Sequence, residues 1–219
     1  MIRGIYRWCV LAIGRVLGFI YVRKYVVEGR ENVPKDGGLI VASNHLNNAD
    51  PPFIALALGR PPIFMAKKEM LELPIAGPLF RAWGTFPVRR GEADLGAIRE
   101  ATSVVDRGEL LLMFPEGTRS RDARLAKGHP GTGLIALRTG APVLPVAISG
   151  SEVAKWPAIF VKPRSVPQIK VVIGRPFTLE RPQRVNGPAA KEATETIMQH
   201  IADLLPESYR GAYSEDGQT

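Results

Sequence analysis

The residue pair with the clearest chemical potential is His45 and Asp50, which stand five positions apart in the segment Asn44–Pro51. A neutral imidazole that donates one N–H to a carboxylate keeps its other nitrogen unprotonated, and this nitrogen can take a proton from a hydroxyl group. With the intervening loop folded back, the Asp50 carboxylate reaches the His45 ring. The spacing therefore indicates a general base and the acid that orients it.

Both residues also have an ordinary structural interpretation. Asp50 precedes Pro51, Pro52 and a helical stretch, so it is a candidate N-cap with Pro51 at the first helical position. A cap uses one carboxylate oxygen and leaves the other free for His45. His45 considered alone is also compatible with a loop histidine that makes structural hydrogen bonds.

A second polar segment, Phe114–Ser120, follows an apolar run. Its first four residues suit a type I turn, with proline at the second position and glycine at the fourth. A plain turn leaves Arg119, Arg121 and Arg124 unexplained. Arginine binds phosphate through its planar fork, and glycine lets the backbone approach a ligand closely. The segment therefore favours an anion-binding loop over a solvated basic loop.

Short runs rich in β-branched residues alternate with helical stretches after the N-terminal segment. Strands are predicted at Tyr25–Glu28, Gly38–Ala42, Ile63–Ala66, Thr85–Val88, Leu110–Phe114, Val143–Ile148 and Ile169–Ile173. Helices are predicted at Pro51–Leu58, Glu69–Ala82, Ala93–Asp106, Thr132–Thr139 and Ala189–Leu205. This alternation predicts a single α/β domain with a largely parallel or mixed sheet flanked by helices.

The polar residues of interest sit at one kind of position. His45, Lys67, Arg90 and Glu116 each come soon after a predicted strand. Lys67 and Arg90 each belong to a pair of adjacent cations, which is usually solvated surface. Ligands of open α/β sheets bind outside the carboxyl ends of the strands. We therefore expect these side chains to converge on one cleft that accepts an anion.

The composition is that of an ordinary globular protein, with 219 residues, of which 45% are hydrophobic and 23% charged. A formal net charge of +8 predicts anionic partners. Nucleic acid is disfavoured, because the aromatic residues are not interleaved with basic ones in the way that single-strand binding favours. The single cysteine excludes an intramolecular disulfide, and the three histidines lack zinc-ligand spacing, so no metal site is expected.

Residues 1–24 are apolar but interrupted by arginine and lysine. The uncharged runs Trp8–Gly14 and Val16–Val22 have seven residues each, whereas a spanning helix needs roughly 20. We predict a basic, apolar helix in the membrane interface; the alternative is a surface helix packed on the domain's own core. Residues 25–205 then form the folded domain, and residues 206–219 form a flexible polar tail.

Four blocks of the chain together resemble the 1-acyl-glycerol-3-phosphate acyltransferases and related glycerolipid acyltransferases. The blocks are Asn44–Asp50 with its His-x-x-x-x-Asp pattern, Ala66–Arg90, Phe114–Ser120 and Ala141–Val146. The resemblance covers roughly Val26 to Phe177. Two positions depart from the family pattern: Arg89 stands where an acidic residue is common, and Asn47 or Asn48 replaces a serine often found in the first block.

The resemblance implies transfer of an acyl chain from acyl-CoA or acyl carrier protein to the free sn-2 hydroxyl of 1-acyl-glycerol-3-phosphate (lysophosphatidic acid). The product would be phosphatidic acid, and no cofactor is implied besides the thioester substrate. The implied roles are general base and its partner for His45 and Asp50, phosphate binding for Lys67, Arg90 and Arg119, and a share in the phosphate and glycerol site for Glu116, Gly117 and Thr118. Membrane lipids would be partners, and the cytoplasmic face of the cell membrane the location.

Two alternatives stay open at this point. The acceptor could instead be glycerol-3-phosphate or a lysophospholipid with a larger headgroup. The chain could also be a peripheral membrane-binding protein that keeps the fold without catalysis.

Overall fold

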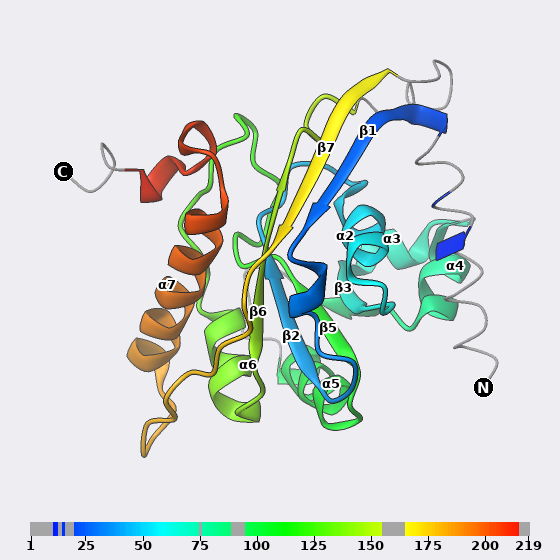
Figure 1. Ribbon diagram of the computed structural model, residues 1–219. Helices are drawn as coiled ribbons and strands as arrows, with labels where there is room; N and C mark the ends of the chain where they lie inside the picture. The colour runs from blue at the N-terminus through cyan, green and yellow to red at the C-terminus, as the bar shows by residue number, and fades with distance from the viewer. Residues whose placement is uncertain are drawn as a thin grey trace.

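The computed structural model describes residues 11, 12, 15, 20–74, 76–88, 95–154 and 165–214. Within them, seven strands form one sheet with the spatial order β1-β7-β6-β2-β5-β3-β4 (Figure 1). The strands are β1 (Val22–Glu28), β2 (Leu39–Ser43), β3 (Ile63–Lys67), β4 (Phe86–Val88), β5 (Leu110–Met113), β6 (Val143–Ser149) and β7 (Val166–Ile173). All seven predicted strands are present, several with shifted ends.

The sheet is mixed. Strands β6, β2, β5, β3 and β4 run parallel to one another. Strand β7 pairs antiparallel with β6 and parallel with β1. The parallel strands therefore end together at one edge of the sheet, called the carboxyl edge below, where β1 and β7 begin. The predicted α/β domain with a largely parallel or mixed sheet flanked by helices is confirmed.

Helices pack on both faces of the sheet. They are α2 (Asp50–Leu58), α3 (Lys68–Glu72), α4 (Ala76–Trp83), α5 (Leu95–Asp106), α6 (Gly131–Thr139) and α7 (Gly187–Leu204). One core cluster joins α2 and Trp83 to strand residues such as Val41. The other joins α5, α6 and α7 to intervening residues such as Ile40. Because side chains alternate along a strand, the central strands are apolar on both faces.

The prediction of one helix over Glu69–Ala82 is wrong, because the chain forms α3 and α4 there. Leu73 leaves the helical conformation, with φ −59° and ψ 135°. Pro74 follows it, and a proline ring displaces the preceding residue from the helical region. The break allows α4 to turn back and pack against α3.

Helix α2 is a fixed support for its first residue, Asp50. Most of its residues are buried in the core. Arg30 donates Nε to Ala57 O at 2.9 Å and Nη2 to Leu56 O at 2.6 Å. A cation thus satisfies carbonyl groups at the end of the helix, where the helix dipole favours positive charge.

Residues 206–214 are ordered, contrary to the predicted flexible tail over 206–219. They form two short 3₁₀ helices, η3 (Glu207–Tyr209) and η4 (Gly211–Tyr213). Tyr213 is 5% exposed and lies in the same core cluster as α7. The polar composition of this segment hides its aromatic anchors, which supply the buried surface. Residues 215–219 lie outside the described residues.

Most of the predicted interface helix, residues 1–24, also lies outside the described residues. Its last residues, from Val22 onward, belong to β1 instead. Leu11 is 6% exposed and shares a core cluster with Ala55 and Leu56 of α2, which is the packing expected of the alternative interpretation. No helix among the described residues has both the length and the apolar content that a bilayer crossing requires.

Candidate active site

His45 and Asp50 meet in the loop between β2 and α2, at the carboxyl edge. His45 Nδ1 lies 2.8 Å from Asp50 Oδ2. The Asp50 side chain is fully buried, and the His45 side chain keeps 10% of its surface exposed. Among the described residues, Nε2 of His45 has no hydrogen-bond partner. The predicted proximity is confirmed, and the predicted catalytic role stays a prediction.

Asp50 is not the N-cap that its sequence context suggested. It is the first residue of α2, and Ala49 takes the cap position without a side-chain hydrogen bond. Asp50 Oδ2 instead accepts the N–H of Leu46 at 2.6 Å and that of Asn47 at 2.7 Å. Together with the His45 ring, three donors converge on this oxygen. The loop is therefore folded around the carboxylate, as the spacing required.

Phe114 fixes the plane of the His45 ring. The two rings are stacked with centroids 4.0 Å apart and planes inclined by 18°. Phe114 follows β5, which neighbours β2 in the sheet. Sequence reasoning treated Phe114 only as the start of a turn and missed this contact.

Glu116 links His45 to the loop that follows β5. Its Oε1 accepts the N–H of His45 and its Oε2 that of Ala126, each at 3.0 Å. Ser120 N–H donates to His45 O at 2.8 Å, which ties the same two loops again. Both Glu116 oxygens thus contact backbone groups. The predicted share of Glu116 in a glycerol site stays a prediction, and its observed contacts hold His45 in place.

Burial also changes the acidity of Glu116. The residue is 3% exposed, and burial raises the pKa of its carboxyl to about 7, although the N–H groups of Ala126 and His45 oppose the shift. A carboxylate that is costly to ionise is therefore kept beside His45 by the two hydrogen bonds that it accepts.

The predicted turn at Phe114–Gly117 is present, with Gly117 N–H donating to Phe114 O at 2.9 Å. Gly117 has a φ of +66°, and a Cβ there would lie 2.9 Å from Cδ2 of His129. Both the conformation and the space therefore require glycine. Thr118 and Arg119 come next and are exposed.

Two of the three cations predicted to bind phosphate lie along the carboxyl edge. Lys67 ends β3 and is exposed. Strand β3 is separated from β2 by β5, which places the two strands roughly 10 Å apart. Arg119 precedes Ser120, which is bonded to His45. Arg90 lies outside the described residues. The binding roles of all three stay predictions.

Two asparagines to which sequence reasoning assigned no role hold the His45 loop to β6 and the loop after it. Asn44 donates Nδ2 to Ile148 O at 2.9 Å and accepts Ile148 N–H at 2.8 Å, so its side chain continues the sheet after β2 ends. Asn47 donates Nδ2 to Ala154 O at 2.8 Å. Asn44 is 2% exposed. The available signal was an amide directly after a buried strand, where an unpaired amide would be costly.

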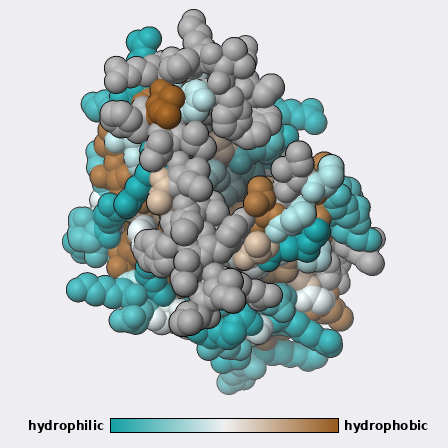
Figure 2. All heavy atoms as spheres, turned by 90° about the vertical axis from the view of Figure 1, so that its right-hand side faces the viewer, coloured by the Kyte–Doolittle hydropathy of each residue, from teal (hydrophilic) through white to brown (hydrophobic). Residues whose placement is uncertain are grey.

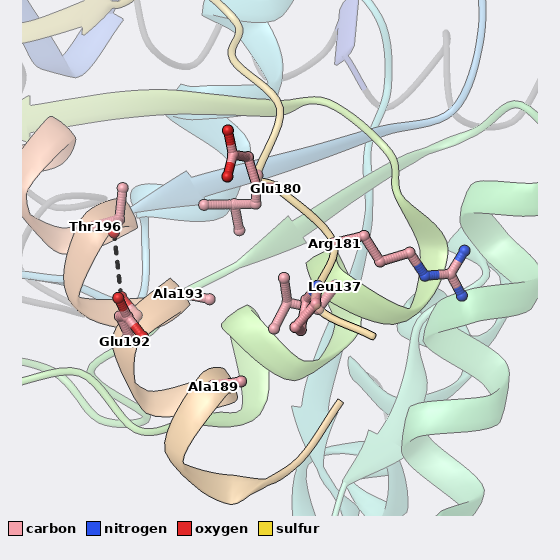
Figure 3. A pocket seen from close by; sticks show the side chains of 9 residues that line it. Leu137, Glu180, Arg181, Ala189, Glu192, Ala193 and Thr196 are labelled. Carbon is pink, nitrogen blue, oxygen red and sulfur yellow. Dashed lines mark hydrogen bonds between the residues drawn. The ribbon is translucent and has the colours of Figure 1, made fainter. Parts of the chain in front are cut away.

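A surface hollow lies apart from this arrangement, between α6, α7 and residues 179–182 (Figure 3). Glu180, Arg181 and Glu192 are its charged lining residues. Thr196 in its wall donates Oγ1 to Glu192 O at 3.2 Å. None of the residues predicted for the site lines this hollow, so it has no part in the chemistry of His45.

The raised pKa of Glu116 predicts a pH-dependent stability. Because the folded protein holds the proton up to about pH 7, against 4.5 for an unshifted glutamate, this group's contribution to the free energy of unfolding falls as pH rises between those values. Glu116→Gln lacks this slope, which is at most about 1.4 kcal/mol per pH unit. Urea unfolding from pH 5 to 8 measures the difference. Parallel plots of the free energy of unfolding against pH for the wild type and Glu116→Gln would contradict the prediction. Glu192→Gln, at an exposed position, is the matched control.

Comparison with known proteins places this site in a family. Residues 24–149 match a family model described as "Acyltransferase". The chain is 30% identical over 206 residues to the 1-acyl-sn-glycerol-3-phosphate acyltransferase of Bacillus subtilis, covering 91% of this chain and 96% of that protein. It is 31% identical over 128 residues to the chloroplastic 1-acyl-sn-glycerol-3-phosphate acyltransferase BAT2 of Brassica napus, covering 57% of this chain and 37% of the relative.

A solved structure agrees with these sequence matches. The crystal structure of the 1-acyl-sn-glycerophosphate acyltransferase PlsC from Thermotoga maritima superposes with a TM-score of 0.68 at 28% identity, covering 90% of this chain and 80% of that one. The aligned part of this chain spans only 37%, 36% and 51% of the length of the curated relatives from Brassica napus, Arabidopsis thaliana and Borreliella burgdorferi. Because the family model matches more than half of the chain, and the Bacillus relative aligns along nearly all of it, the chain belongs to the acyltransferase family.

Proposed function

We propose that the protein transfers an acyl chain from a thioester to the sn-2 hydroxyl of 1-acyl-sn-glycerol-3-phosphate, giving phosphatidic acid. The observation that carries the proposal is the 2.8 Å contact between His45 Nδ1 and Asp50 Oδ2, with Nε2 left unpaired among the described residues. The acceptor is chosen because the Bacillus, Brassica and Thermotoga proteins carry this substrate in their names.

The chemistry follows from the two ring nitrogens of His45. Nδ1–H donates to Asp50, so Nε2 is the basic nitrogen and takes the proton of the acceptor's hydroxyl group. The resulting oxygen nucleophile attacks the thioester carbonyl carbon and forms the ester C–O bond. The C–S bond then breaks, and the leaving thiolate recovers the proton from Nε2. Asp50 holds the ring through this contact throughout the reaction and stabilises the transient imidazolium.

The acceptor's phosphate supplies the second half of recognition. Lys67, Arg90 and Arg119 provide the cations, and the backbone at Gly117 and the exposed Thr118 provides a wall for the glycerol. Glu116 shapes that wall by holding the loop behind it. The acyl donor is either acyl-CoA or acyl carrier protein, since both present the same thioester carbonyl to the attacking oxygen of the acceptor. No further cofactor takes part.

A lipid acceptor requires a membrane surface, and we infer that the protein works there, on the cytoplasmic face that the family resemblance implies. The face that carries α3 and α4 shows hydrophobic residues beside hydrophilic ones (Figure 2). Leu73 and Leu79 of this region are 44% and 53% exposed, and Lys68 and Arg81 are exposed near them. Apolar side chains flanked by cations suit an anionic headgroup layer.

Replacing the base tests the reaction itself. His45→Ala should lower kcat by about 10²–10⁴-fold, because it removes general-base assistance, and Asp50→Asn should cause a loss of the same order by removing the anion that orients the ring. Thiol release from acyl-CoA and from acyl carrier protein in detergent micelles measures both. Asp203→Asn, an exposed acid on α7, is the matched control. Unchanged turnover in His45→Ala would refute its role as the base, and absence of turnover in the wild type would leave a non-catalytic membrane-binding protein.

Replacing the cations tests the acceptor. Lys67→Ala and Arg119→Ala should each raise KM for lysophosphatidic acid about tenfold with little change in kcat, because a phosphate contact is equally strong in ground and transition states. Monoacylglycerol, which lacks the phosphate, should be a poor acceptor for every variant. Lys191→Ala on α7 is the control. Preference for glycerol-3-phosphate or for a lysophospholipid with a larger headgroup would overturn the assignment of the acceptor.

Removing charge near the N-terminus tests membrane binding. The double variant Arg7→Gln with Arg15→Gln should bind anionic vesicles about thirtyfold more weakly, because each of the two cations contributes about 1 kcal/mol at such a surface. Sedimentation with phosphatidylglycerol vesicles measures binding. Arg184→Gln with Lys191→Gln removes the same charge from exposed positions elsewhere. Equal losses in both double variants would refute a specific role of the N-terminal segment.

A further inference from the structure

The segment Pro206–Tyr213, called the C-terminal strap below, lies outside residues 24–149 that the family model matches. It follows α7 and contacts two loops at the carboxyl edge. The first is the loop of residues 114–128 after β5, and the second is the loop of residues 150–154 after β6. Each of these loops is itself bonded to the loop that carries His45 and Asp50.

The first contact consists of two hydrogen bonds to the backbone of Leu125. Leu125 N–H donates to Tyr209 O at 2.8 Å, and Ala212 N–H donates to Leu125 O at 3.0 Å. Gly211 has a φ of +51°, and a Cβ there would lie 2.4 Å from Leu125 O, so only glycine fits between the two strap residues. Leu125 is 3% exposed. This part of the loop is therefore fixed by the strap.

Two hydrogen bonds connect the residue after Leu125 to the backbone of His45. The next residue, Ala126, donates its N–H to Glu116, and Glu116 accepts the N–H of His45. A displacement of Leu125 consequently moves the acceptor that holds the backbone of His45.

The second contact is made by a side chain. Tyr209 donates its hydroxyl to Glu152 Oε1 at 2.7 Å. Two residues further on, Ala154 O accepts the side-chain N–H of Asn47, whose own N–H donates to Asp50 Oδ2 at 2.7 Å. Burial, together with the carboxylate of Glu152, raises the pKa of Tyr209 to about 12, so its hydroxyl remains a donor throughout the working range of pH.

We propose that the C-terminal strap is part of the catalytic scaffold, and that Tyr209 is a positioning residue for the His45–Asp50 pair. The inference rests on the proposed function. Its two paths are independent, since one reaches the backbone of His45 through Leu125 and the other reaches Asp50 through Glu152. A general base is effective only when its nitrogen is held within a fraction of an ångström of the position from which it takes the proton. Hydrogen bonds that hold this position therefore affect kcat.

Tyr209→Phe tests the proposal with one atom removed. We expect kcat to fall about threefold to tenfold, the rate equivalent of one hydrogen bond, while KM for the acceptor stays unchanged. Tyr213→Phe is the matched control, because it removes the same atom from the same segment. Its hydroxyl donates to Glu195 of α7 at 3.1 Å and not to the second loop, so its kcat should fall by less than that of Tyr209→Phe. Equal losses of kcat in both variants would mean that the strap contributes only to the general stability of the protein, and would overturn the proposal.

A double-mutant cycle separates positioning from global destabilisation. Glu152→Ala should lower kcat as much as Tyr209→Phe does, and the combination should be no worse than either alone, because both remove one shared contact. Additive losses would contradict a path through Glu152.

A readout without turnover keeps this test apart from that of the proposed function. Amide hydrogen exchange of Leu46 and Asn47, whose N–H groups are held by Asp50, should accelerate more in Tyr209→Phe than in Tyr213→Phe. If the wild-type protein transferred no acyl group, the function would fail while the exchange result still decided the role of the strap. Unchanged exchange in Tyr209→Phe would overturn the strap's role whatever the activity.

Discussion

One carboxylate oxygen organises the centre of this molecule. Oδ2 of Asp50 accepts the Nδ1–H of His45 and the backbone N–H groups of Leu46 and Asn47, so the loop between β2 and α2 has to close around it. A fully buried anion is costly unless it is hydrogen-bonded, and these donors offset that cost. The place of Asp50 at the N-terminus of α2 adds the favourable end of the helix dipole. The same contacts that stabilise the charge therefore set the tautomer and direction of the histidine.

Residues that follow or belong to several strands hold the His45 loop around that oxygen. Phe114 after β5 stacks on the ring, Glu116 in the same turn holds the His45 backbone, and Asn44 continues the sheet alongside β6. Their convergence depends on parallel strands that end at one edge, because only then do the loops after β2, β5 and β6 become neighbours. Glu116 shows the cost of such a support, since burial disfavours its charged form while its two hydrogen bonds favour it.

Sequence reasoning succeeded where local chemistry decides the outcome. The seven strands were recognisable because the central strands are continuous apolar runs, and the turn at Phe114–Gly117 because proline and glycine have restricted uses in turns. It failed where distant packing decides. The helix expected over Glu69–Ala82 is an exception, because Pro74 breaks it locally after Leu73. The tail that looked polar is anchored by Tyr209 and Tyr213. Asp50 likewise turned its carboxylate toward the loop rather than capping α2.

The order of residues along the chain by itself determined the fold class, the partnership of His45 with Asp50 and the strands after which the functional residues stand. The periodicity of the apolar residues and the short spacing between His45 and Asp50 predict these features directly. Only the tertiary structure decided that Glu116, Asn44 and Phe114 hold His45 in position. It also decided that Tyr209, more than 160 residues after His45 in the chain, contacts a loop that is bonded to the His45 loop. A hydrogen bond depends on the distance between two atoms in space. Which partners come within that distance is settled by packing the whole chain, and no short stretch of sequence records it.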